Sequence, residues 1–196
     1  MDINFLREKV KRLSEDDLHE NHSLSMTTMH EKKFLHEVVK LLKPESVLVE
    51  IGCYSGGSMS IMANSNPNVK MHTVDLFSIN GTDKTSRDAE FQRVNSLLSS
   101  FDNVTVHSGN SFVDFGWWNT PIDLLFDDGS HEDPSLTRSM DHWLQFLKPG
   151  GILMMHDNHV YFPDVQKYVN RLIESNEFYH IDQIDTLAVF IKREKL

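Results

Sequence analysis

The chain has 196 residues, of which 39% are hydrophobic and one is a cysteine, so it can build one core but no internal disulfide. Its 19 Lys and Arg against 29 Asp and Glu give a formal net charge of −10, which disfavours a nucleic acid as partner. The apolar runs fall short of the roughly 18 residues of a membrane span and no signal peptide is evident, so we expect one cytoplasmic domain over residues 1–196, with no membrane partner.

The N-terminal segment, residues 1–28, is predicted to hold a helix and then a mobile cap. Apolar residues at helical spacing indicate a helix near Asn4 to Leu13. The stretch from Asp16 to Thr28 is polar and rich in histidine, so we predict a loop with little to bury. Apolar residues recur every three or four positions from about Met29 to Leu42, which indicates the next helix, and Pro44 ends it.

The next segment has the pattern of a strand, a turn and a helix. Ser46 to Ile51 (SVLVEI) is predicted to be a buried strand, and the glycines that follow turn the chain into a helix beginning near Ser58. Val69 to Val74 is predicted to be the second strand, which ends at Asp75. The piece from Ser78 to Arg87 is rich in small polar residues, so we predict a long loop there.

The second half of the chain continues to alternate strands with helices. Further strands are predicted at Val104–His107, Ile122–Phe126, Ile152–Met155, Tyr179–Ile181 and Leu187–Ile191. Further helices are predicted around Phe91 to Leu98, Pro134 to Phe146 and Pro163 to Ile173. The last two strands would form an antiparallel hairpin around Asp182 to Thr186. The whole pattern predicts an α/β fold, with a mostly parallel seven-stranded sheet and helices on both of its faces.

Ligands of an open parallel sheet bind beyond the carboxyl ends of its strands, so candidate functional residues should follow the predicted strands. These residues are Glu50–Gly57, Asp75, Gly109–Ser111, Asp127–His131 and His156–Asn158. The first cluster, in VLVEIGCYSGGS, places glycines where the backbone can approach a ligand, but the G-x-G-x-x-G spacing that seats a pyrophosphate is absent. The turn therefore suits an uncharged linkage such as a ribose and a thioether. The alternative is that the glycines only make a tight turn.

Two further strand ends carry polar side chains that suit a nucleoside. Asp75 can accept two hydrogen bonds from ribose hydroxyls, although a carboxylate in this place could equally cap its own turn. The amide of Asn110 could meet an adenine edge, although asparagine is also a common residue at a helix N-cap.

The motifs EIGCYSGGS, VDL, DLLFDDGSH and LKPGGILMMHDN occur in this order and resemble the successive motifs of class I S-adenosylmethionine (SAM)-dependent methyltransferases. The resemblance runs from about Thr28 to the C-terminus. It is closest to the small-molecule O-methyltransferases that contain a D-G-x-H element, the group that includes macrolide-sugar, antibiotic-tailoring and cephamycin-pathway enzymes. It implies the Rossmann-like class I methyltransferase fold, with SAM as the cofactor.

The resemblance also implies which residues bind SAM. They are Glu50, Gly52 and Gly56 at the methionine end, Asp75 at the ribose, Asn110 and Ser111 at the adenine, and Tyr54, Ser58, Leu76 and Asp127 beside them.

Members of this group commonly hold a divalent metal with an acidic residue after the fourth strand and an acidic or amide pair after the fifth. Asp128, Asp157 and Asn158 stand at those places, and their oxygens are hard ligands that suit Mg²⁺. A cation there would lower the pKa of an acceptor hydroxyl and aim its oxygen at the methyl group. The alternatives are that these are ordinary loop residues, that no metal is used, or that Asp127 is the ligand in place of Asp128.

His131 follows Asp128 by three residues, and D-G-x-H members of the group carry this histidine, which is placed to take the hydroxyl proton. A nearby cation would help to keep its imidazole neutral and basic. His131 and Asp128 are therefore the predicted catalytic residues, and the alternative for His131 is a plain helix-cap residue. His156 and His159 flank this group, but we interpret most of the 11 histidines as surface residues.

The sequence thus predicts a SAM- and Mg²⁺-dependent O-methyltransferase acting on a hydroxyl of a small molecule, such as a sugar, an aromatic compound or a natural-product intermediate. Three alternatives stay open: a metal-independent methyltransferase with His131 as base, a SAM-binding protein without catalysis, and an NAD-dependent oxidoreductase, against which the missing G-x-G-x-x-G argues. The sequence does not indicate the acceptor, because residues 14–30 and 77–87, which would shape its pocket, are predicted loops. A homo-oligomer is compatible with the sequence.

Overall fold

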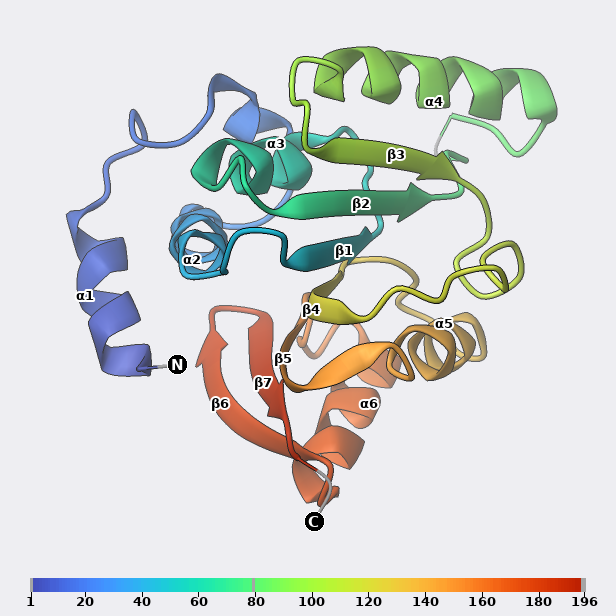
Figure 1. Cartoon of the computed structure of the whole chain (residues 1–196). Coiled ribbons are helices and arrows are strands. Elements are labelled where there is room, and N and C mark those ends of the chain that lie inside the picture. Colours follow the sequence, from blue (N-terminus) through green and yellow to red (C-terminus); the bar gives the residue numbers. More distant parts are fainter. Residues whose placement is uncertain (1, 79, 195–196) are drawn as a thin grey trace.

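The computed structural model describes residues 2–78 and 80–194. Met1 of the predicted N-terminal segment, Ile79 of the predicted loop 77–87 and the last two residues of the predicted domain lie outside the described residues. The described chain forms a sheet with helices on both faces (Figure 1). Its strands are β1 (Val47–Ile51), β2 (Lys70–Asp75), β3 (Val104–Ser108), β4 (Ile122–Asp127), β5 (Leu147–Met155), β6 (Phe178–Ile184) and β7 (Leu187–Lys192).

The seven strands lie in the order β3-β2-β1-β4-β5-β7-β6. The strands β1 to β5 pair in parallel, and β7 runs antiparallel to both β5 and β6. This arrangement confirms the predicted sheet and its C-terminal antiparallel hairpin. The chain order reverses between β1 and β4, which makes their carboxyl ends the place where such a sheet binds ligands.

The sheet separates two apolar cores because side chains alternate between its faces. In β4, Leu124 and Phe126 belong to one core and Leu125 to the other. The first core is covered by α1 to α4 and the second by α5 and α6 (Figure 1). The helices are α1 (Ile3–Arg12), the 3₁₀ helix η1 (Glu20–Leu24), α2 (Met29–Lys40), α3 (Gly57–Ser65), α4 (Lys84–Leu98), α5 (Ser135–Trp143) and α6 (Pro163–Glu174).

The N-terminal helix and α2 begin close to the predicted positions. Asp2 caps α1 by accepting hydrogen bonds from the backbone of its first turn. Thr28 caps α2 in a capping box, in which its side chain accepts from the backbone N–H of Glu31 and the Glu31 side chain accepts from the backbone N–H of Thr28. The capping box defines where α2 starts, and it places the Glu31 carboxylate at the first turn of this helix.

The prediction that residues 16–28 form a loop with little to bury is wrong. The segment contains η1, and Leu18 and Thr27 are buried. A Cβ added to Gly57 would come within 2.1 Å of the backbone nitrogen of Ser25, so the backbone of this segment lies directly on α3. Contact between backbones leaves no hydrophobic pattern, which explains why the sequence did not indicate it.

The boundaries of several elements also differ from the prediction, and β6 continues to Ile184, into the predicted turn Asp182 to Thr186. The expected loop 78–87 ends early because the Asp83 side chain caps α4, which begins at Lys84. The strand β5 begins at Leu147 instead of Ile152, because Leu147 pairs with Ile122 before a register shift. Correspondingly, α5 ends at Trp143.

Within residues 2–78 and 80–194, no helix combines the length and apolar character that crossing a membrane requires.

Candidate active site

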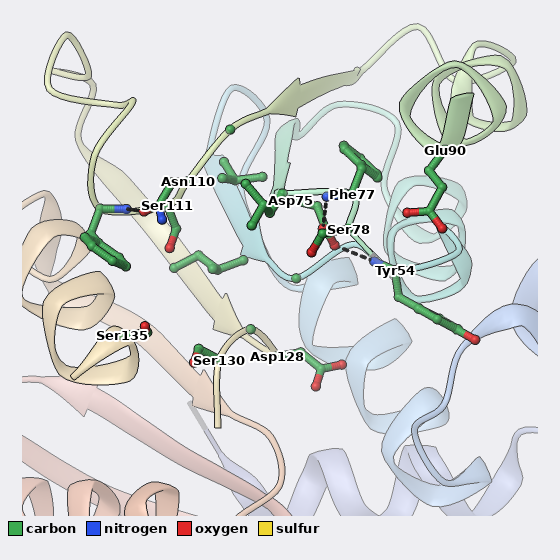
Figure 2. A pocket seen from close by; sticks show the side chains of 17 residues that line it. Tyr54, Asp75, Phe77, Ser78, Glu90, Asn110, Ser111, Asp128, Ser130 and Ser135 are labelled. Atoms are coloured by element: carbon green, nitrogen blue, oxygen red, sulfur yellow. Dashed lines mark hydrogen bonds between the residues drawn. The ribbon is translucent and has the colours of Figure 1, made fainter. Parts of the chain in front are cut away.

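A cavity of about 390 Å³ opens at the carboxyl ends of β1, β2, β3 and β4 (Figure 2). Six of the predicted SAM-binding residues line it, namely Gly52, Tyr54, Asp75, Leu76, Asn110 and Ser111. Asp128, predicted as a metal ligand, lines it as well. In Figure 2, Asn110 and Ser111 lie on one side of Asp75 and Tyr54 lies on the other. The strand-end argument therefore located the cavity and most of its wall.

Gly52 joins the turn after β1 to the turn after β4. Its φ is +89°, and a Cβ there would lie 2.0 Å from the carbonyl oxygen of Asp128. The backbone N–H of Asp128 in turn donates to the carbonyl of Ile51 at 2.8 Å. Only glycine permits both this conformation and this close approach. The turn after β1 and the turn after β4 therefore lie against each other at one edge of the cavity.

Asp75 organises the turn after β1. One of its carboxylate oxygens, Oδ2, accepts the backbone N–H groups of Cys53 at 2.7 Å and Tyr54 at 2.8 Å. The other, Oδ1, accepts the backbone N–H of Phe77 at 2.6 Å. Asp75 therefore both lines the cavity and caps the turns around it, which combines the two roles considered from the sequence. Contact with a ribose stays a prediction.

Glu50 is not brought to the cavity. Its side chain is fully buried and accepts hydrogen bonds from the hydroxyls of Ser58 at 2.5 Å and Thr73 at 2.6 Å. Burial raises the pKa of Glu50 to about 8, so this carboxyl is largely protonated at neutral pH. Gly56, Ser58 and Asp127 are likewise absent from the cavity wall. Direct contact with SAM stays a prediction for these four residues.

The two consecutive acids after β4 differ in their surroundings. Asp127 is buried, burial raises its pKa to about 7, and its Oδ1 accepts no hydrogen bond from the described residues. Asp128 reaches the cavity, and although burial raises its pKa, the hydrogen bond from His156 acts in the opposite direction. Asp128, rather than Asp127, is therefore the acid that the structure presents at the cavity.

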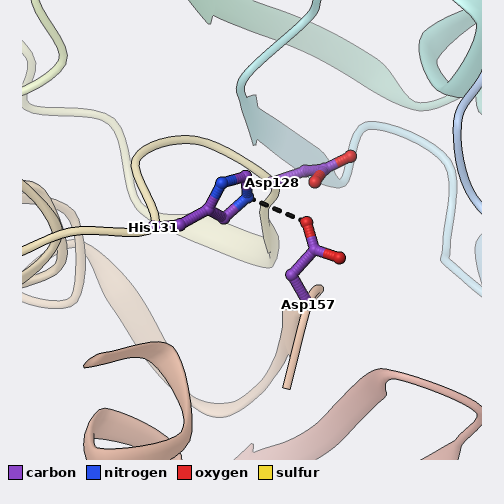
Figure 3. A group of neighbouring side chains, drawn as sticks. All are labelled: Asp128, His131 and Asp157. Atoms are coloured by element: carbon purple, nitrogen blue, oxygen red, sulfur yellow. Dashed lines mark ion pairs between the residues drawn. The ribbon is translucent and has the colours of Figure 1, made fainter. Parts of the chain in front are cut away.

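Asp128, His131 and Asp157 form a second group of side chains beside the cavity (Figure 3). Each offers one potential ligand atom, and these three atoms all lie within 4.8 Å of one another. His131 Nε2 lies 2.8 Å from Asp157 Oδ2. This contact raises the pKa of His131 above its ordinary value. Although burial acts to raise the pKa of Asp157, the contacts with His131 and His156 hold it well below its usual range.

His156 belongs to the same network, contrary to our interpretation of most histidines as surface residues. It is 8% exposed, and its Nδ1 lies 3.0 Å from Asp128 Oδ1 and 3.3 Å from Asp157 Oδ2. Its Nε2 lies 3.1 Å from Oε2 of Glu31 on α2. Although burial acts to lower it, these carboxylates raise the pKa of His156 to about 12. Its place directly after β5 was the one signal in the sequence, whereas Glu31 had none.

Among the described residues, the structure shows no contact between the Asn158 side chain and this group. Its backbone N–H donates to the carbonyl of Thr186 and its Nδ2 to Oε1 of Gln183, both at 2.9 Å, so the side chain is tied to the β6–β7 hairpin. Its Oδ1 is buried and accepts no hydrogen bond from the described residues. Asn158 therefore stays a predicted ligand, and His131 is the third donor found with Asp128 and Asp157.

The donor set fits a divalent cation. Two carboxylates supply the hard oxygens that Mg²⁺ and Mn²⁺ prefer, and an imidazole nitrogen is compatible with Mn²⁺ and other first-row ions. The group lies at the carboxyl ends of β4 and β5, next to the cavity through the shared Asp128.

The doubly covered sheet, its reversed C-terminal hairpin and the cavity at its switch point define a class I SAM-dependent methyltransferase. Residues 49–158, more than half of the chain, match the family described as a methyltransferase domain, and the chain belongs to this family. The family assignment removes the NAD-dependent oxidoreductase from the alternatives.

Solved structures with the same fold include O-methyltransferases. A proposed caffeoyl-CoA O-methyltransferase from Staphylococcus aureus is 18% identical, with a TM-score of 0.68 over 98% of this chain and 92% of that chain. A proposed O-methyltransferase from Klebsiella pneumoniae is 16% identical, with a TM-score of 0.66 over 97% and 96%. The SAH-bound methyltransferase PaMTH1 of Podospora anserina is 15% identical, with a TM-score of 0.65 over 98% and 87%. At these identities the likeness shows the fold alone.

Proposed function

We propose that this methyltransferase moves the methyl group of SAM to a hydroxyl of a small molecule. The observation that carries the proposal is that Asp128 belongs both to the cavity wall and to the group with His131 and Asp157. Side chains capable of acid–base chemistry thus lie at one end of the cavity that we assign to SAM. The order of Asn110, Asp75 and Tyr54 around the cavity agrees with adenine, ribose and methionine lying in that direction (Figure 2).

His131 is the group we assign to the hydroxyl proton. Its Nε2 lies 2.8 Å from Asp157 Oδ2, so we assign the proton of the neutral ring to Nε2 and the role of acceptor to Nδ1. The acceptor oxygen gives its proton to Nδ1 and forms a bond to the methyl carbon as the bond from that carbon to sulfur breaks. Asp157 stabilises the imidazolium that results, in the way a carboxylate supports a catalytic histidine elsewhere.

Asp128 and Asp157 would hold a divalent cation such as Mg²⁺. The Oδ1 of Asn158 is buried and has no partner among the described residues, which supports its assignment as a further oxygen ligand. When bound, the cation would lower the pKa of the acceptor hydroxyl and orient its oxygen. The two carboxylates also concentrate negative charge beside the position we assign to the positively charged sulfonium.

A metal-independent reaction is the second candidate, and one specific observation favours it. His156 Nδ1 already lies close to both the Asp128 and the Asp157 carboxylates, where the positive charge of the protonated ring offsets part of their negative charge without a metal. In this case His131 alone would remove the proton, with Asp157 as its support.

The test is transfer of radiolabelled methyl from SAM to a panel of catechols, other phenols and sugars, with EDTA and after Mg²⁺ is restored. Turnover that EDTA removes and Mg²⁺ restores supports the metal-dependent reaction. Turnover that EDTA leaves unchanged supports the metal-independent one. A protein that binds SAM in calorimetry but methylates nothing in the panel contradicts the proposal and favours a non-catalytic SAM-binding module. The His131→Gln variant should lose transfer in either case.

A further inference from the structure

Glu31 is a fully buried carboxylate on the first turn of α2, outside the matched methyltransferase residues 49–158. It accepts four hydrogen bonds. Oε1 accepts the backbone N–H and the hydroxyl of Thr186, both at 2.8 Å. Oε2 accepts the backbone N–H of Thr28 at 2.7 Å and faces His156 Nε2 at 3.1 Å. A charge buried this deeply is tolerated only with such full compensation.

His156 connects Glu31 to the candidate active site. One ring nitrogen faces Glu31 and the other faces Asp128 and Asp157. Both ring nitrogens therefore have carboxylate partners, and these contacts on two sides of the ring fix its plane. The position of the two active-site carboxylates is therefore linked to the first turn of α2.

Capping of α2 does not explain this arrangement. A capping box needs one side-chain oxygen at this position and works on a solvent-exposed helix end, whereas Glu31 is 0% exposed and uses both oxygens. We propose that Glu31 is a positioning residue that holds, through His156, the Asp128 and Asp157 carboxylates in their working geometry. This inference rests on the proposed function of those two carboxylates.

The Glu31→Gln variant tests the proposal, because an amide keeps the size of the side chain but removes its charge and leaves one acceptor oxygen for the four donors. With the best acceptor of the panel above, we expect kcat to fall about 10- to 100-fold, the range typical of lost outer-shell partners. The dissociation constant for SAM should change by less than about threefold, since Glu31 is absent from the cavity wall.

Thr186→Val is the matched control. It removes a hydrogen bond to Oε1 of Glu31 but leaves the Oε2 side, which faces His156, intact. Its thermal stability should fall while kcat stays within about twofold of the wild type. Equal losses of kcat in Glu31→Gln and Thr186→Val would show that Glu31 only stabilises the fold, and would overturn the proposal.

A double-mutant cycle tests whether Glu31 and His156 act together on kcat, which a purely structural role of Glu31 does not predict. If Glu31 acts through His156, adding Glu31→Gln to His156→Gln should lower kcat by no more than about twofold further. Independent, multiplying losses would overturn the proposal. Should Glu31→Gln fail to fold, Glu31→Asp, whose carboxylate is too short to reach all its partners, takes its place in the cycle.

An NMR measurement keeps the test separate from the proposed function. At a fixed neutral pH, the wild type should show a hydrogen-bonded Nε2 proton of His156 that is absent in His156→Gln. Loss of this Nε2 proton signal in Glu31→Gln supports the proposal even if the wild type methylates no acceptor. An unchanged Nε2 signal in Glu31→Gln would overturn it even if the enzyme is active.

Discussion

His131 Nε2 and Asp157 Oδ2 lie 2.8 Å apart, so an ion pair joins the loop after β4 to the loop after β5. The pair raises the pKa of His131 above its ordinary value of 6.5. A raised pKa means that the imidazole stays charged to a higher pH than a free histidine.

The first prediction concerns this titration. In protein freed of divalent ions, NMR titration should give His131 a pKa above 6.5, and Asp157→Asn should lower it, because the carboxylate that favours the charged ring is gone. Adding Mg²⁺ should also lower it, since a nearby cation disfavours the imidazolium. A pKa that does not respond to Mg²⁺ would count against a metal at Asp128 and Asp157.

The Asp128→Asn variant tests the acid that the cavity and the polar group share. We expect turnover to fall at least about 100-fold, because the substitution removes a charge from the reacting end of the site. SAM affinity, measured by calorimetry, should weaken less than about fivefold, because the other residues of the wall are unchanged. Asp127→Asn is the comparison variant. If it proves the more damaging of the two, the assignment of the working acid is reversed.

Asp75→Asn should disturb the turn after β1. The carboxylate accepts three backbone N–H groups, and an amide would point its own N–H₂ at one of them. A mismatched buried donor of this kind costs about 1 to 3 kcal/mol of stability. Thermal melts should show this loss, and the stabilisation by added SAH should shrink with it. A variant that melts and binds SAH like the wild type would show that Asp75 does not organise the turn.

The raised pKa of Glu50 predicts that the free energy of unfolding depends on pH. Below its ordinary pKa of 4.5 both folded and unfolded chains hold the proton, and between 4.5 and about 8 only the folded chain does. The free energy of unfolding should therefore decrease as pH rises through this interval, by up to about 5 kcal/mol from this group. Urea titrations of Glu50→Gln should show a flatter profile over the same range. An equally steep profile in the variant would mean that another group is responsible.

The alternation of apolar runs predicted the sheet, and the rule that ligands bind beyond the strand ends then predicted the place of the cavity and of Asp75 and Asp128 in its wall. It failed to distinguish Glu50 from these residues. Glu50 lies inside β1, opposite Thr73 of β2, so its side chain enters the core instead of extending beyond the strand. When both faces of a strand are buried, the sequence alone does not show which side chains point to which layer of helices.

The contacts of Glu31 and the backbone packing of residues 16–28 could not be predicted from the sequence for a different reason. Glu31 meets His156 across 125 positions of sequence, and it has the spacing of an ordinary capping residue. Such long-range polar contacts depend on how α2 lies against the β6–β7 hairpin, and no local pattern encodes that arrangement.

A crystal structure of the protein with SAH tests the central claim most directly. We predict the ribose beside Asp75, the adenine near Asn110 and Ser111, and the sulfur at the end of the cavity where Asp128 lies. SAH bound elsewhere, or bound in the cavity with its sulfur directed away from Asp128 and His131, would contradict the account.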